Sequence, residues 1–167
     1  MYSNKNLVFL GMMGSGKSSI GNLVSKKINL PFIDIDNLIT ETTGMSILEI
    51  FEKKGENYFR EIEEKTTLKV LKGKNNIISL GGGAFLNKNI QKEVLRNHIS
   101  FWLNWETNTL INRIKNNKKR PIANNSSVNE LTKLIKKRSL IYSKALYKIN
   151  CENFTKNEIA EKILKNL

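Results

Sequence analysis

The chain has only one cysteine and one histidine among its 167 residues, and only two prolines. The lone Cys151 cannot form an internal disulfide, and neither it nor His98 stands in a zinc-binding or nucleophile motif. Charged residues, Asn or Gly interrupt every apolar run before the ~18 residues that a membrane helix needs. The first six residues are polar, with no apolar signal core behind them. We therefore expect a soluble, cytoplasmic protein without disulfides, membrane spans or a zinc centre.

Negative charge is also scarce, because 28 Lys and Arg stand against 15 Asp and Glu, a formal net charge of +13. Such a balance is typical of nucleic-acid-binding proteins. The lysines are scattered, however, as at Lys26-Lys27 and Lys136-Lys137, with no aromatic platform or helix-turn-helix signature beside them. We expect solvated lysines that attract small anionic substrates, and no nucleic-acid partner. The length predicts a single domain over residues 1–167.

What the chain does contain is a glycine-rich segment, Gly11-Met12-Met13-Gly14-Ser15-Gly16-Lys17-Ser18, directly after the apolar run Leu7 to Leu10. This spacing matches the phosphate-binding loop, in which backbone N–H groups and the positive end of the next helix surround an anion. Lys17 would reach the β- and γ-phosphates, and Ser18 would ligate Mg²⁺. The alternative is a glycine-rich turn that matches by chance. The nucleotide-binding residues expected here are Gly14, Ser15, Gly16, Lys17, Ser18 and Ser19.

Short apolar runs alternate with longer helical patterns along the chain, which is typical of βαβ units around a parallel sheet. Three Ser/Thr-x-x-Glu boxes, beginning at Ser46, Ser127 and Thr155, predict helix starts. The last of these helices would bury a face that ends at Leu167. The basic run 115–120 has no apolar period, so we expect a mobile loop there. Five strands are expected, at residues 7–10, 31–35, 76–80, 99–104 and 147–150.

Two acidic residues, Asp34 and Asp36, close the second expected strand, and the carboxyl ends of parallel strands are where ligands bind. Two residues apart on a strand, their carboxylates would face the same side. Asp34 could complete a Mg²⁺ site, and Asp36 could accept or orient the proton of an acceptor hydroxyl. The third strand leads into Gly81-Gly82-Gly83, whose bare backbone lets a ligand come close. The alternatives are a helix N-cap before Asn37 and a flexible glycine turn.

Arg138 falls on the apolar stripe of its expected helix, where an unpaired guanidinium would be costly. Its partner is either a structural carboxylate or a bound carboxylate or phosphate. Arg60 can pair within its helix with Glu63 or the adjacent glutamate, so spacing alone does not separate an ion pair from a ligand contact. Phe51 and Phe59 are most simply core residues, with an aromatic wall beside a carbocyclic ligand as the alternative.

Taken together, these residues resemble the shikimate kinase family over nearly the whole chain. The order and spacing of the motifs make the set specific, although only the phosphate-binding loop is distinctive by itself. The motifs are Gly11 to Ser19 with Ile20-Gly21, Asp34-x-Asp36, Gly44-x-Ser46-Ile47-x-Glu49-Ile50-Phe51, Gly55-Glu56-x-x-Phe59-Arg60-x-x-Glu63, Ser79 to Gly83, Arg113 with Arg120-Pro121, and Arg138 ahead of Tyr142.

The resemblance implies a three-layer α/β/α P-loop kinase fold, with a five-stranded parallel sheet in the order 2-3-1-4-5. It implies ATP-dependent phosphorylation of the 3-hydroxyl of shikimate, with an acceptor segment over about residues 34–63. It further implies that Asp36 contacts this hydroxyl, that Arg60 and Arg138 hold the shikimate carboxylate, and that Gly82 donates from its backbone. The full acceptor set is Asp36, Phe51, Phe59, Arg60, Gly81, Gly82, Gly83 and Arg138.

On the nucleotide side, the resemblance implies a lid over about residues 113–126. Arg120 from this lid would neutralise the transferring phosphoryl group together with Lys17 and Mg²⁺, and Arg113 would lie against the adenine. The catalytic residues would thus be Lys17, Asp36 and Arg120, with Ser18 and Asp34 at the metal. The expected partners are shikimate and ATP, bound to a monomer. The rival hypotheses are a gluconate or nucleoside-monophosphate kinase and a basic nucleic-acid-binding NTPase.

Overall fold

A five-stranded parallel sheet forms the centre of the computed structural model, which describes residues 4–116 and 126–167. The strand order β2-β3-β1-β4-β5 confirms the prediction. β1 lies in the middle, with Leu7 in register with Ile77 and Ile99 on the two neighbouring strands. Its four consecutive buried residues follow from this central position. The strands are β1 (Leu7–Leu10), β2 (Phe32–Asp34), β3 (Ile77–Ser79), β4 (Ile99–Asn104) and β5 (Tyr147–Asn150).

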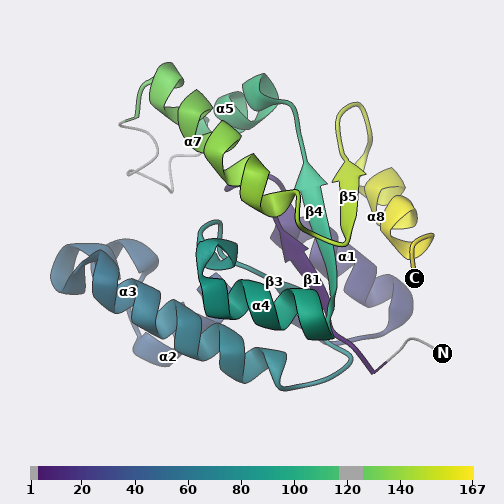
Figure 1. Cartoon of the computed structure of the whole chain (residues 1–167), viewed down its shortest axis with the longest axis horizontal. Helices are drawn as coiled ribbons and strands as arrows, with labels where there is room; N and C mark the ends of the chain where they lie inside the picture. Colours follow the sequence, from purple (N-terminus) through teal and green to yellow (C-terminus); the bar gives the residue numbers. More distant parts are fainter. Residues whose placement is uncertain (1–3, 117–125) are drawn as a thin grey trace.

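Helices cover both faces of this sheet (Figure 1). Leu7 and Phe9 of β1 join one hydrophobic cluster with α1 (Lys17–Ile28) and α8 (Lys156–Leu164). Val8 and Leu10 point the other way, as the two-residue period of a strand requires. The two clusters together make the predicted three-layer α/β/α arrangement. On the second face lie α2 (Ile35–Thr43), α3 (Ile47–Leu71), η1 (Ala84–Leu86), α4 (Lys88–Asn97), α5 (Thr107–Lys115) and α7 (Val128–Tyr142).

The three predicted capping boxes are confirmed at the starts of α3, α7 and α8. In each, the Ser or Thr side chain accepts a backbone N–H from the Glu three residues later, and that Glu accepts the N–H of the cap residue. One prediction about the last helix, that its buried face ends at Leu167, is wrong. Because α8 ends at Leu164, Leu167 is not part of its buried face and is 38% exposed.

The end of the second strand also differs from the prediction. β2 stops at Asp34 and α2 begins at Ile35, so Asp36 lies in the first turn of a helix and not on a strand. The cause is local, because the Asp34 carboxylate accepts the backbone N–H of Asn37 at 3.2 Å and caps α2. Strand alternation therefore does not align the two carboxylates. Asp34 caps α2 through Oδ1, which does not exclude its predicted part in a Mg²⁺ site.

The predicted lid over 113–126 is helical at its start. Arg113 and Lys115 lie in the last turn of α5, because the apolar period continues to the buried Ile114. Residues 117–125, including Arg120, lie outside the described residues. Among the residues that are described, no helix is long and apolar enough to cross a membrane.

Candidate active site

The glycine-rich loop after β1 has the backbone that phosphate binding requires. Gly14 and Gly16 adopt φ values of 79° and 87°, in the left-handed region that suits glycine. Gly16 also begins α1, and no side chain caps this helix start, whereas α3, α7 and α8 have their N-termini closed by capping boxes. The first N–H groups of α1 and its positive dipole end are thus available to bind an anion.

Lys17 extends back over the same loop. Its ammonium donates to the carbonyl oxygens of Gly11 at 2.8 Å and Met12 at 3.0 Å, and the residue is only 9% exposed. Backbone carbonyls thus hold the ammonium at the mouth of the loop, where the terminal phosphates of a nucleotide would lie.

Ser18 and Asp34 meet beside the loop. The Ser18 hydroxyl donates to Asp34 Oδ2 at 2.5 Å, joining the first turn of α1 to the end of β2. A hydroxyl and a carboxylate are the oxygen donors that Mg²⁺ uses alongside phosphate oxygens and water. No cluster of three or more His, Cys, Asp or Glu in the described part of the chain could hold a metal by itself. The pair fits a Mg²⁺ ion that nucleotide phosphates share.

Asp36 and Glu63 flank Gly81, which follows β3. A Cβ atom added to Gly81 would lie 2.7 Å from Asp36 Oδ1 and 2.6 Å from Glu63 Oε1. Only glycine leaves room for both carboxylates at this point. α2 and α3 therefore each contribute one carboxylate to the end of β3.

Arg60 lies beside Gly83 and connects two glutamates. Its guanidinium donates to Glu63 Oε2 at 2.7 Å and to Glu56 Oε1 at 3.1 Å. A Cβ atom on Gly83 would come within 2.7 Å of Arg60 Nη1. The predicted helical ion pair with Glu63 is thus present, while the second glutamate, Glu64, bonds Asn87 and Asn89 instead.

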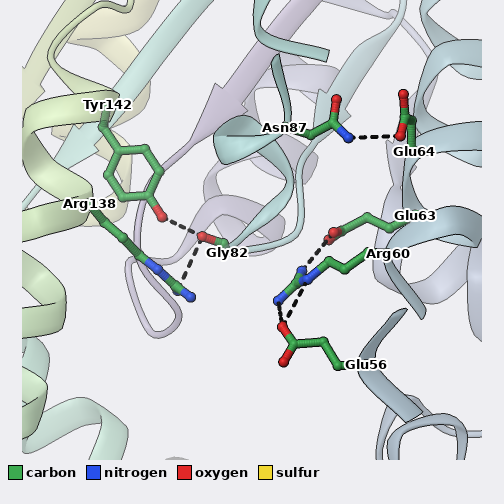
Figure 2. Close-up of polar contacts among 8 residues, drawn as sticks. All are labelled: Glu56, Arg60, Glu63, Glu64, Gly82, Asn87, Arg138 and Tyr142. Carbon is green, nitrogen blue, oxygen red and sulfur yellow. Dashed lines mark hydrogen bonds and ion pairs between the residues drawn. The ribbon is translucent and has the colours of Figure 1, made fainter. Parts of the chain in front are cut away.

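Arg138 approaches the same glycine segment from α7, opposite Arg60 (Figure 2). Its Nη1 donates to the Gly82 carbonyl at 3.3 Å, and the Tyr142 hydroxyl donates to the same oxygen. The buried Nε of Arg138 has no hydrogen-bond partner among the described residues. Within those residues Arg138 makes no ion pair, which favours a bound anion over a structural carboxylate as its partner.

Arg60, Glu63 and Arg138 border one cavity of about 320 Å³, whereas Asp36, Gly81 and Gly82 are not among its lining residues. Gly82 joins it to the phosphate loop, because a Cβ atom on Gly82 would lie 3.4 Å from the backbone nitrogen of Met13. A site with two guanidinium groups, bordered by glutamates and continuous with an anion-binding loop, can hold a small carboxylate beside a phosphate. The cavity is lined by Glu56, Arg60, Glu63, Glu64, Gly83, Leu86, Asn87, Ile90 and Arg138.

Glu63 is the most deeply buried carboxylate of this site, at 3% exposure. Burial raises its pKa above the ordinary value, and the negative charge of Asp36 acts in the same direction. The ion pair with Arg60 and the charge of Arg138 oppose this rise in pKa. Tyr142 is buried as well, which raises the pKa of its phenol to about 12 and keeps the hydroxyl a donor at neutral pH.

Comparison with known proteins identifies the family of this chain. The family model described as shikimate kinase matches residues 13–167. The chain belongs to the shikimate kinase family. A shikimate kinase of Thermodesulfovibrio yellowstonii is 40% identical over 162 residues, which are 96% of this chain and 94% of the relative. One of Sulfurihydrogenibium sp. is 37% identical over 163 residues, covering 98% of both chains. The family sets the reaction, ATP-dependent phosphorylation of shikimate.

The fold agrees with solved members of the shikimate kinase family. The shikimate kinase of Acinetobacter baumannii, solved in complex with shikimate, superposes with a TM-score of 0.91 at 28% identity. The match covers 98% of this chain and 93% of that one. The expected P-loop kinase architecture is thereby confirmed.

Not every residue predicted for shikimate kinase chemistry lies in the cavity. Phe51 and Phe59 pack against each other with tilted rings whose centroids are 4.8 Å apart, and Phe59 is a core residue at 4% exposure. Neither lines the cavity, so the structure favours their packing role. Arg113 lies beside the phosphate loop, with its Cβ 3.4 Å from the position of a Cβ on Gly14. Arg120 falls outside the described residues.

Sequence reasoning gave Glu63 and Tyr142 no role in the site, although both lie there. The signal available for Glu63 was its position three residues after Arg60, which reads equally as a surface ion pair. Trp105 was missed entirely, and its indole N–H donates to the Ser15 carbonyl in the phosphate loop at 2.9 Å. No local pattern marks a contact between residues that lie so far apart in sequence.

Proposed function

We propose that this chain transfers the γ-phosphoryl group of ATP to the 3-hydroxyl of shikimate, at the junction between the phosphate loop and Gly81-Gly82-Gly83. The observation that supports this placement is the convergence of Arg60 and Arg138 on that glycine segment. Two guanidinium groups can bind a ring carboxylate with directed hydrogen bonds. The shikimate-bound neighbour from Acinetobacter baumannii supports the choice of ligand.

On the nucleotide side, Lys17 and the N–H groups of the loop would bind the β- and γ-phosphates. Ser18 and Asp34 would hold the Mg²⁺ ion that is expected with ATP, and this ion would supply charge neutralisation between the phosphates. We assign Arg120 to the transferring phosphoryl group and Arg113 to the adenine. Such a site works by alignment and charge neutralisation, because phosphoryl transfer needs little covalent help from the protein.

On the acceptor side, we assign the shikimate carboxylate to Arg60 and Arg138, with the Gly82 backbone as an additional donor. Asp36 would orient the 3-hydroxyl and accept its proton as the new P–O bond forms. Glu63 holds the Arg60 guanidinium at 2.7 Å, which fixes one of the two carboxylate-binding groups. Proton acceptance by a carboxylate at hydrogen-bond distance is general-base catalysis of the usual kind.

We further propose that residues 1–167 act as one kinase domain and as a monomer in the cytoplasm, with Mg²⁺, ATP and shikimate as its ligands. Size-exclusion chromatography with light scattering tests the monomer directly. A dimer at micromolar concentration would overturn that part of the proposal.

The test of the reaction is an acceptor panel. Purified protein with ATP and Mg²⁺ is assayed for ADP release with shikimate, gluconate or a nucleoside monophosphate. We expect the highest kcat/KM for shikimate, because gluconate lacks the ring that spaces carboxylate from hydroxyl and a nucleoside monophosphate carries no carboxylate for the two guanidinium groups. Higher kcat/KM with gluconate or the nucleotide would refute the assignment.

A further inference from the structure

The chain has two tryptophans, at positions 102 and 105, and the second lies at the nucleotide end of the site. Trp105 directly follows β4, where it packs against both hydrophobic clusters. Its indole N–H donates to the Ser15 carbonyl at 2.9 Å. The ring is therefore fixed from two sides, by packing and by a hydrogen bond to the phosphate loop.

Arg113 lies over this ring. Its guanidinium carbon is 3.6 Å from the centroid of the Trp105 ring, a close cation–π contact. A guanidinium is planar and has two faces, so a group that contacts one face leaves the opposite face available to a ligand. Arg113 is an exposed residue, and its contact with the indole restricts the side chain.

The segment after β5 lies near the same guanidinium. Glu152 in this segment accepts the Thr109 hydroxyl at 2.8 Å and the backbone N–H of Glu106 at 3.3 Å, which joins the segment to the start of α5. Burial raises the pKa of Cys151 to about 12. The positive charge of Arg113 acts in the opposite direction and lowers this pKa, so the guanidinium lies near Cys151. Arg113 is therefore close to both the phosphate loop and the segment after β5.

We propose that Trp105 is a positioning residue for the nucleotide, which holds the Arg113 guanidinium flat so that its opposite face receives the base. The inference rests on the proposed function, because the base is placed by the phosphates in the Gly11–Ser18 loop. A free arginine side chain loses rotamer freedom when it stacks on a ligand. Trp105 restricts the rotamers of Arg113 before the nucleotide binds, so less rotamer freedom is lost on binding.

Binding measurements on whole protein separate this role from a general effect on the loop. The affinities of ADP and of inorganic tripolyphosphate are measured by calorimetry for the parent chain, Trp105→Leu and Trp105→Phe. We expect Trp105→Leu to weaken ADP about 3- to 10-fold, the range for one side chain left unordered, with tripolyphosphate unchanged. Trp105→Phe keeps a ring under Arg113 and should restore most of the ADP affinity.

Fluorescence gives a second readout. Trp102→Phe leaves Trp105 as the sole tryptophan, and its emission should change when ADP is added and should not change with tripolyphosphate. Trp105→Phe leaves Trp102, which is 6% exposed in β4, and its emission should not respond. The steady-state signature is a raised KM for ATP in Trp105→Leu with kcat and the KM for shikimate unchanged.

Three results would overturn the inference: equal ADP affinity in Trp105→Leu and the parent chain, an equal loss for ADP and tripolyphosphate, or no recovery in Trp105→Phe. An inactive parent chain would instead refute the proposed function, while the ADP titrations would still decide the role of Trp105. The two failures are therefore distinguishable.

Discussion

A single methyl group at Gly81 tests whether two carboxylates share the acceptor site. In Gly81→Ala the new Cβ would lie 2.6 Å from Glu63 Oε1 and 2.7 Å from Asp36 Oδ1, against an ordinary contact distance of 3.4 Å or more. Gly81 is not among the glycines with positive φ, so alanine fits the backbone itself. Both carboxylates must therefore retreat by more than half an ångström, and Asp36 moves away from the acceptor hydroxyl.

The size of the effect follows from this displacement. A misplacement of about 1 Å costs catalysis on the order of 10²-fold, so we expect kcat to fall roughly 10- to 100-fold. Overpacking lowers the unfolding free energy, whereas alanine raises it slightly because it reduces the entropy of the unfolded chain. The net loss of unfolding free energy is about 1–2 kcal/mol. The melting temperature should fall by roughly 2–8 °C, so the variant remains folded at assay temperature. Steady-state kinetics and scanning calorimetry measure the two quantities.

Neighbouring glycines provide the controls. Alanine at Gly82 meets its nearest atom at 3.4 Å, so Gly82→Ala reports the effect of the substitution on stability without the clash. Gly83→Ala would push only the flexible end of Arg60, 2.7 Å away, and should raise the KM for shikimate more than it lowers kcat. Parent-like kcat and melting temperature in Gly81→Ala would refute the placement of Asp36 and Glu63 around Gly81.

Three further predictions concern single side chains. Asp36→Asn should abolish transfer while ADP still binds in calorimetry, because Asp36 is assigned to the acceptor; loss of ADP binding would contradict that role. Glu158→Gln should lower the melting temperature at neutral pH, since the Thr155 backbone N–H lowers the pKa of Glu158 and so stabilises the fold when the carboxylate is ionised. This difference should fade as the pH falls below the ordinary value of 4.5, and a difference that persists in acid would be inconsistent with it. Cys151 is buried with its pKa raised to about 12, so iodoacetamide should label it only as the protein unfolds, and rapid labelling of the native chain would be unexpected.

Local patterns in the sequence predict most of the fold. The apolar run Leu7 to Leu10 predicts a buried strand, and in the structure its alternate residues join two clusters. The three-layer arrangement and the strand order were expected from the family resemblance. The helix starts follow from capping boxes, whose partners are only three residues apart. Interactions between residues so close in sequence can be predicted without a structure.

The site is harder to predict, because its key contacts are long-range or depend on competing local signals. Asp34 reads as a strand end, but its own side chain caps the next helix and carries Asp36 into that helix. The meeting of Glu63 with Gly81, and of Trp105 with Ser15, depends on how elements pack and not on any spacing. Arg138 was singled out because a cation on an apolar stripe demands an anion, and the structure places its guanidinium against the Gly82 carbonyl.

The most direct test of the central claim is phosphorus NMR of the product formed from ATP and shikimate by the purified chain. We predict one phosphate-ester resonance that couples to the ring proton at C3, appearing together with ADP and only when Mg²⁺ and shikimate are both present. An ester at another hydroxyl, or ADP formed without any ester, would contradict a site that aligns the 3-hydroxyl with the terminal phosphate.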